Sequence, residues 1–192
     1  MGIANTDPAH PKHPAHPKQD GAPSPASDSR HGKHQFLKPQ RINADNTLSD
    51  FSCGVPLINQ WARNRSATAV KHGTAVTYVS RTTEGEAAGF YALSAYSVDR
   101  ADVLGGWLRR NTPDRIPAVL IGMLGVDRRF QGEGLGWKLL QDAIMRAQSI
   151  SRQLGSRAIV VDPYDEAARA FYAHFGFSPI PGSSSMYLKL AQ

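Results

Sequence analysis

The chain has 192 residues, a formal net charge of +6 at pH 7 and a pI of about 9.7. This length is typical of one domain with a tail, and no apolar stretch approaches the ~20 residues that a membrane-spanning helix needs. The N-terminus has no apolar core of the signal-peptide kind, and Cys53, the single cysteine, cannot form an internal disulfide, which favours a reducing, cytoplasmic setting. The basic charge suits nucleic acid or nucleotide phosphates, and equally suits solubility alone.

Residues 1–41 differ in composition from the rest. They hold seven of the 13 prolines and five of the seven histidines, with almost no large apolar side chain before Phe36. Such a segment cannot bury enough surface to offset its ordering entropy, so we predict a disordered tail. The histidines are irregularly spaced without ligand partners, so we expect no metal site. The folded domain is predicted to span 42–192.

Hydrophobic periodicity and turn residues predict the elements of this domain. In chain order we expect a capped turn at 47–51, a helix over 56–66, strands over 75–79 and 88–93, a basic loop around Trp107, a strand over 118–126, a helix over 135–154, a strand over 158–161, a helix over 165–174 and a strand over 186–190. This order matches a mixed α/β sheet with helices on both faces.

The glycine-rich segment 131–136 lies between the apolar strand 118–126 and the amphipathic helix 135–154. A strand, a glycine loop and a helix start leave backbone N–H groups unpaired at the positive end of the helix dipole, which favours phosphate. A dinucleotide-binding fingerprint needs a further glycine where Trp137 and Leu139 stand, and a P-loop needs a Gly-Lys-Ser/Thr triplet that does not follow.

The loop instead fits the pattern Gln/Arg-x-x-Gly-x-Gly/Ala, through Gln131, Gly134 and Gly136. It resembles the acetyl-CoA pyrophosphate loop of the GCN5-related N-acetyltransferases (GNAT family). The resemblance implies a mixed, mostly antiparallel central sheet with helices on both faces, acetyl-CoA as co-substrate and no metal. The residues that it places at the cofactor are Leu124, Gly125, Val126, Gln131, Gly132, Glu133, Gly134, Leu135, Gly136 and Asp165.

The segment 168–177 resembles the closing motif of the same family, Ala-x-x-Phe/Leu-Tyr-x-x-x-Gly-Phe. The resemblance assigns Tyr172 as the general acid that protonates the departing thiolate. A phenol with a pKa near 10 stays protonated at neutral pH and can do this. The alternative is a packing tyrosine, and His174 is an alternative acid or base.

Three positions depart from the family pattern. Asp165 stands where an asparagine often contacts the cofactor, and it is equally suited to cap the helix. Met123 replaces an arginine of the preceding strand, and Gly125 replaces an alanine. The Met123 substitution puts any substrate contact of that arginine in doubt.

Upstream blocks around Phe51–Gly54, Leu57, Trp61 and Gly89–Ser94 resemble one branch of the family, the tRNA-acetylating toxins of type II toxin–antitoxin systems. This resemblance implies acetylation of the α-amine of aminoacyl-tRNA, a block of translation, and a ribbon-helix-helix antitoxin as partner; a homodimer is left open. An α-amine titrates near 8, so it is partly unprotonated at neutral pH and needs no strong base.

Arginines at several positions could hold tRNA phosphates or simply belong to the surface of a basic protein. We predict substrate contacts for Arg63, Arg65, Arg128 and Arg129. Two other functions stay open at this point. One is acetylation of a protein N-terminus, polyamine or other small amine, and the other is a non-catalytic acetyl-CoA sensor or antitoxin-binding module.

Overall fold

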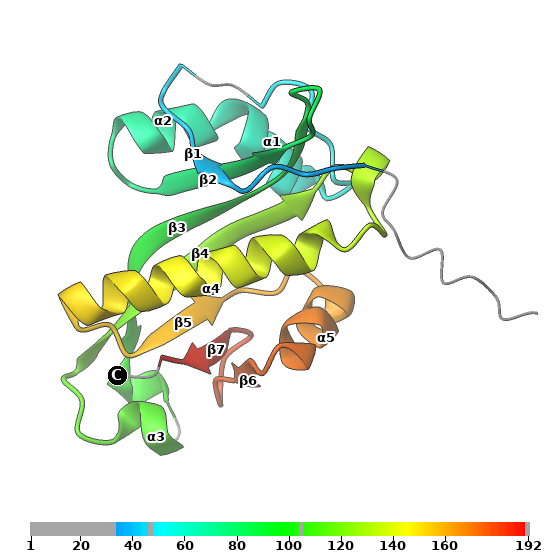
Figure 1. Ribbon diagram of the computed structural model, residues 1–192. Coiled ribbons are helices and arrows are strands. Elements are labelled where there is room, and N and C mark those ends of the chain that lie inside the picture. The colour runs from blue at the N-terminus through cyan, green and yellow to red at the C-terminus, as the bar shows by residue number, and fades with distance from the viewer. Residues whose placement is uncertain (1–33, 46–47, 104–105, 191–192) are drawn as a thin grey trace, which may run out of the picture. The chain divides into compact units, whose positions relative to one another are not determined.

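Seven strands form one sheet in the order β1-β2-β3-β4-β5-β7-β6 (Figure 1). The structure, a computed structural model, describes residues 34–45, 48–103 and 106–190. Only β4 and β5 pair in parallel, and every other neighbouring pair is antiparallel, which confirms the predicted mixed sheet. The strands are β1 Gln40–Arg41, β2 Val76–Arg81, β3 Ala87–Asp99, β4 Arg115–Val126, β5 Ala158–Val161, β6 Ser178–Pro179 and β7 Met186–Lys189.

Helices cover both faces of this sheet, as predicted. Figure 1 shows α4 lying across β3 and β4, with α1 and α2 near the β2 edge. The helices are α1 Pro56–Asn64, α2 Ser66–Lys71, α3 Gly106–Arg109, α4 Leu135–Leu154 and α5 Glu166–His174, and short 3-10 turns cover Arg100–Asp102 and Arg128–Phe130. In the described part of the chain, no helix is long and apolar enough to cross a membrane.

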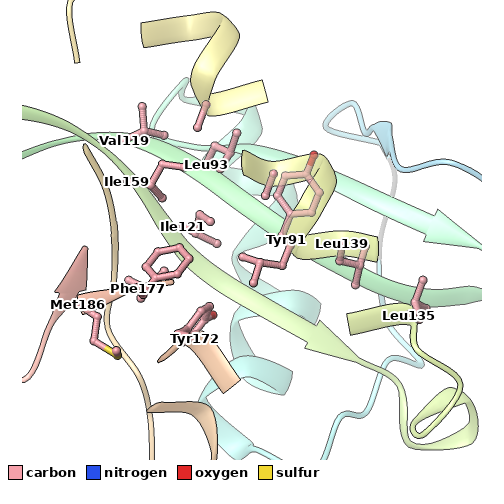
Figure 2. Packing of buried hydrophobic residues seen from close by; sticks show 14 of the residues in the cluster. Tyr91, Leu93, Val119, Ile121, Leu135, Leu139, Ile159, Tyr172, Phe177 and Met186 are labelled. Atoms are coloured by element: carbon pink, nitrogen blue, oxygen red, sulfur yellow. The ribbon is translucent and has the colours of Figure 1, made fainter. Parts of the chain in front are cut away.

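The main core lies between the sheet and α4. Inner-face residues of β3, β4 and β5 meet the apolar stripe of α4, and Tyr172 and Phe177 close the cluster at its other end (Figure 2). The predicted stripe is largely confirmed, because Leu135, Leu139 and the residues that follow at helical spacing are buried. Leu154 is 75% exposed at the last turn. A second core packs α1 on the opposite face, and a third lies beside α3.

One charged residue of α4 also points inward. Asp142 is buried, and its Oδ2 accepts hydrogen bonds from the Tyr91 hydroxyl and, at 2.7 Å, from Arg146 Nε. Burial and this carboxylate raise the pKa of Tyr91 well above its ordinary value. Because a buried charge is stable only when it is paired, this triad fixes the position of α4 over β3.

The folded region begins earlier than residue 42. Residues 40 and 41 form β1 against β2, and Phe36 bridges to Thr82 and stacks edge-on against Phe130 at 5.8 Å. The boundary drawn at 41 was therefore wrong for residues 34–41, because Phe36 finds an apolar partner far along the chain. The predicted disorder of residues 1–33 falls outside the described residues.

Two further boundaries differ from the prediction. The helix expected over 56–66 is two helices, because Arg65 leaves helical geometry and the Ser66 hydroxyl donates to Ala62 O at 2.6 Å. The β4 strand also begins at Arg115 and runs through Pro117, three residues before the predicted start at residue 118. Pro117 O accepts from Arg157 N on the β5 side, so the missing proline N–H costs no bond to β3.

Candidate active site

The sheet opens between β4 and β5. Their parallel pairing ends at Ile121 and Val161, whereas β4 continues to Val126 with β3 as its partner. Asp127 N donates to a β3 carbonyl at 2.8 Å, and successive residues of a strand direct their backbone groups to opposite sides. The N–H and C=O groups of Leu124 and Val126 therefore face into the opening, where amide groups of a ligand arm can pair with them.

Gly125, predicted at the cofactor, has another task in the structure. By the same alternation its backbone groups face Phe90 on β3. A Cβ at this position would lie 3.1 Å from Ile58 Cγ2 and 3.2 Å from Phe51 Cζ. The glycine, where the family often has alanine, thus lets α1 and the loop before it pack closely on β4.

The glycine loop has the backbone geometry that its sequence predicts. Gly132 and Gly134 have φ of 80° and 76°, the left-handed region that favours glycine. No atom lies within 4 Å of a Cβ built on either residue. The left-handed backbone conformation, and not crowding, therefore favours glycine at these positions, and open space lies beside them. Gly134 is the N-cap of α4 and has no side chain to bond the first N–H groups of that helix, which suits a phosphate.

The side chains of this loop hold the loop itself. Gln131 Nε2 donates to Val126 O at 3.0 Å and to Cys53 O at 2.9 Å. Glu133 accepts the backbone N–H of His34 at 2.9 Å, and its Oε1 lies 2.8 Å from His34 Nδ1. The predicted cofactor contacts of Gln131 and Glu133 are therefore better assigned to their backbone groups.

Asp127 joins the glycine loop to the loop before α1, a role that sequence reasoning missed. Its buried carboxylate accepts from Ser52 N at 2.9 Å, and from Arg129 N and Nε at 3.1 and 2.9 Å. These hydrogen bonds and the Arg129 charge hold the pKa of Asp127 below its ordinary value, although burial opposes the shift. An aspartate directly after a strand, followed by a tight turn, is the signal that identifies such a residue.

Tyr172 lies at the inner end of the opening. Its side chain is 8% exposed and packs against Phe171 and Phe177, at ring distances of 5.4 and 5.3 Å; Figure 2 shows Tyr172 beside Phe177. Its hydroxyl makes no hydrogen bond within the described residues, and burial, with a smaller contribution from the Asp162 charge, raises its pKa to about 12. The phenol thus stays protonated at neutral pH and keeps its donor available.

Asp165 and His174, at the two ends of α5, have ordinary structural positions. Asp165 is the N-cap of α5 and its Oδ1 accepts from Ala168 N at 2.7 Å, so the capping interpretation is confirmed and its cofactor contact stays a prediction. His174 is exposed at the last turn of α5, edge-on to Phe175.

The four predicted substrate arginines fall into two pairs. Arg63 Nε donates to Phe51 O at 2.9 Å, and Arg129 pairs with Asp127 and Glu86. Arg65 is exposed at the junction of α1 and α2, and Arg128 is exposed with its guanidinium against Gly54, where a Cβ would lie 2.9 Å from Nε. Substrate contact is therefore best assigned to Arg65 and Arg128.

Neither a metal centre nor a cysteine nucleophile is found at this opening. No group of three or more His, Cys, Asp or Glu side chains suited to a metal occurs in the part of the chain that the structure describes. Burial raises the pKa of the Cys53 thiol, whose Sγ donates to Asn59 Oδ1 at 3.2 Å. A protonated thiol is a poor nucleophile.

Known proteins are similar to this chain in sequence and in fold. Residues 43–177 match the acetyltransferase (GNAT) family. The chain is 41% identical over 147 residues to a tRNA-acetylating toxin of Mycobacterium tuberculosis, covering 76% of this chain and 87% of the relative.

Two solved structures have the same fold. One is AtaT complexed with acetyl-methionyl-tRNAfMet, with a TM-score of 0.72 and 24% identity over 81% of this chain and 95% of that one. The other is a mutant of AtaT bound to the C-terminus of the antitoxin AtaR, with a TM-score of 0.69 and 23% identity over 81% and 92% of the two chains. This chain belongs to the acetyltransferase (GNAT) family and is an acetyl-CoA-dependent N-acetyltransferase.

Proposed function

We propose that this acetyltransferase transfers an acetyl group from acetyl-CoA to the α-amine of aminoacyl-tRNA and thereby acts as a toxin that blocks translation. The observation that carries the proposal is the juxtaposition of the free edge of β4, the glycine loop and Tyr172 in a chain that is 41% identical to a tRNA-acetylating toxin. A structural neighbour, AtaT, is complexed with acetyl-methionyl-tRNA.

The free edge of β4 and the glycine loop hold the co-substrate in this proposal. The backbone groups of Leu124 and the N–H of Val126 pair with the pantetheine amides, since Val126 O is held by Gln131, and the N–H groups of 131–136 bind the pyrophosphate. The thioester then lies beside the opening, where a strand N–H polarises its carbonyl. The amine attacks the carbonyl carbon, and Tyr172 gives its proton to the departing thiolate.

An α-amine is a suitable acceptor at this site. Its pKa near 8 leaves a substantial unprotonated fraction at neutral pH, whereas a lysine side chain with a pKa near 10.4 is almost fully charged. The exposed guanidinium groups of Arg128, beside the loop before α1, and of Arg65, at the junction of α1 and α2, supply cations for the phosphates of a tRNA end. The positive charge of these two arginines can therefore bind a nucleic-acid substrate, whereas a small amine without phosphates gains nothing from it.

Two partners and a compartment belong to the same proposal. A ribbon-helix-helix antitoxin neutralises the toxin, supported by the neighbour that binds the C-terminus of its antitoxin. The setting is the cytoplasm, where aminoacyl-tRNA is found. A homodimer stays an open prediction.

Controlled expression in a bacterial host tests the proposal. We expect growth to stop on induction, with label from acetyl-CoA accumulating in the RNA fraction. Co-expression of the cognate antitoxin restores growth. If growth stops without label in RNA, or label accumulates in polyamines or protein N-termini, the acceptor is another amine and the proposal is wrong.

A further inference from the structure

Asp162 is the first residue after β5, at the point where β5 and β4 part. The preceding residue, Val161, is paired with Met186 on β7, and both belong to the core cluster that contains Tyr172; Figure 2 shows Met186 and Tyr172 in this cluster. Side chains alternate between the faces of a strand, so Asp162 and Ser185 project to the face opposite α4. Asp162 and Tyr172 thus border the same opening from its two sides.

A chain of hydroxyl groups orients the Asp162 carboxylate. Ser183 Oγ donates to Ser185 Oγ at 3.1 Å, and Ser185 Oγ donates to Asp162 Oδ1 at 2.5 Å. Arg169 on α5 donates to Ser184 O at 2.8 Å and ties this serine loop to the helix that carries Tyr172. The second carboxylate oxygen, Oδ2, has no hydrogen bond within the described residues, and the side chain is exposed. Oδ2 of Asp162 is therefore an oriented hydrogen-bond acceptor that faces solvent.

The carboxylate lies near enough to Tyr172 for its charge to contribute to the raised pKa of that phenol. This electrostatic contact agrees with the strand geometry, since Asp162 follows the β5 residue that packs beside Tyr172. No other carboxylate in the described part of the chain contributes to that shift. Acid and carboxylate therefore lie close together at the opening between β4 and β5.

Space for an acceptor lies beside the serine loop that orients Asp162, on the same face of the sheet. A pocket of about 340 Å³ is lined by Ser183 and Ser185 of the orienting loop, by Val160 of β5 and by Tyr96 of β3, with Asp102 farther along. Tyr96 is 40% exposed and offers an aromatic surface. An amine that enters from this face meets Asp162 before it reaches the free edge of β4.

We propose that Asp162 binds the acceptor amine and takes its proton as the amide forms, an inference that rests on the function proposed above. The neutral amine donates a hydrogen bond to Oδ2, which aims its lone pair at the thioester. As the C–N bond forms and the C–S bond breaks, the nitrogen becomes cationic and acidic. One proton passes from nitrogen to Asp162, and one passes from Tyr172 to the thiolate. Asp162 then returns its proton to the tyrosinate, directly or through water, so that protons balance.

Chemical rescue of two variants tests this role. Asp162→Asn keeps the shape and removes the proton acceptor, whereas Asp162→Ala leaves room for formate. Asp45→Ala is the matched control, because Asp45 is an exposed acid in the turn after β1 and does not line the acceptor pocket. The full chain is assayed with acetyl-CoA and charged tRNA between pH 6 and 9, with and without formate.

We expect both Asp162 variants to lose about 100-fold in kcat/KM for the acceptor, within the range for a general base, with KM for acetyl-CoA unchanged. Formate should restore at least a tenth of the lost rate in Asp162→Ala and leave the wild-type protein and Asp45→Ala unaffected. Retention of activity within threefold at every pH overturns the proposal. So does a loss that formate fails to rescue, or one matched by a higher KM for acetyl-CoA.

The two proposals fail separately in this experiment. If the wild-type protein acetylates no charged tRNA and acetylates another amine, the proposed function is wrong, and the Asp162 variants are then compared on that amine. If the wild-type protein acetylates charged tRNA and the variants do so equally well, the role of Asp162 alone is wrong.

Discussion

Replacement of Tyr172 by phenylalanine separates catalysis from folding at this site. The change removes one oxygen atom and keeps the ring that packs against Phe171 and Phe177. Because the hydroxyl has no hydrogen-bond partner among the described residues, its loss breaks no bond in the folded protein. We expect the free energy of unfolding to stay within about 1 kcal/mol of wild type, because the packing of the ring is kept and no hydrogen bond is lost.

Activity should fall much further than stability. A general acid contributes about 100- to 10,000-fold to a rate, which corresponds to about 2.7–5.4 kcal/mol of transition-state stabilisation. We therefore expect kcat for Tyr172→Phe to drop by at least about 100-fold, with the Kd for acetyl-CoA within threefold of wild type. Because the raised pKa of Tyr172, about 12, keeps the acid protonated, wild-type kcat should not fall between pH 7 and 10 through ionisation of Tyr172.

The assay follows release of CoA thiol, with acetyl-CoA binding and thermal unfolding measured on the same preparations. Tyr164→Phe is the control, since Tyr164 is 59% exposed and precedes the same helix. A variant at position 172 that retains a third or more of wild-type kcat refutes the assigned acid. A loss explained by unfolding or by weak acetyl-CoA binding refutes it equally.

Three further predictions concern the surface, the glycine loop and the core. Arg65→Ala and Arg128→Ala should each raise KM for tRNA and lower the salt slope of binding by about 1. The control is Arg152→Ala, at an exposed arginine at the far end of α4, which should leave KM and salt slope unchanged. Equal effects at all three positions contradict a localised tRNA surface. Asp127→Asn should destabilise the protein by about 1.5–3 kcal/mol at pH 7. Because the pKa of Asp127 is lowered in the folded protein, the stabilisation by its carboxylate is present above about pH 4 and is lost as pH falls through the folded pKa. The free energies of unfolding of the two proteins in urea should therefore converge in acid, and a constant difference contradicts the assignment. Gly89→Ala would place a Cβ 2.8 Å from a leucine of α4 and 3.0 Å from a β4 carbonyl, and should lower the free energy of unfolding by about 1–3 kcal/mol in thermal denaturation; an unchanged midpoint shows that α4 relaxes freely.

Local sequence signals predicted the parts of the fold that depend on local physics. Helix α4 shows its apolar stripe over 20 residues, and its limits, Leu135 and Leu154, are as expected. The glycine loop is equally local, because Gly132 and Gly134 are selected by their own backbone dihedral angles. Tyr172 was singled out by another route, the resemblance of the segment 168–177 to the closing motif of the family, and its role as the acid stays a prediction.

Non-local contacts explain what was missed. The second half of β3 reads Ser-Ala-Tyr-Ser-Val-Asp, which has weak strand propensity, and it is held by its pairing with β4 across Pro117. Phe36 is hidden in a proline- and histidine-rich context, and its burial depends on Phe130. Asp162 is one more acid in the sequence, and its orientation depends on Ser185, 23 residues away.

The central claim is acetylation of the α-amine of aminoacyl-tRNA, and the most direct measurement identifies the acceptor. The purified protein is incubated with acetyl-CoA and total charged tRNA, the RNA is digested, and the masses of the aminoacyl-adenosines are measured by mass spectrometry. We predict that at least one aminoacyl-adenosine gains the mass of one acetyl group on its α-amine. The account is contradicted if the aminoacyl-adenosines stay unmodified while the same protein consumes acetyl-CoA when another amine is present.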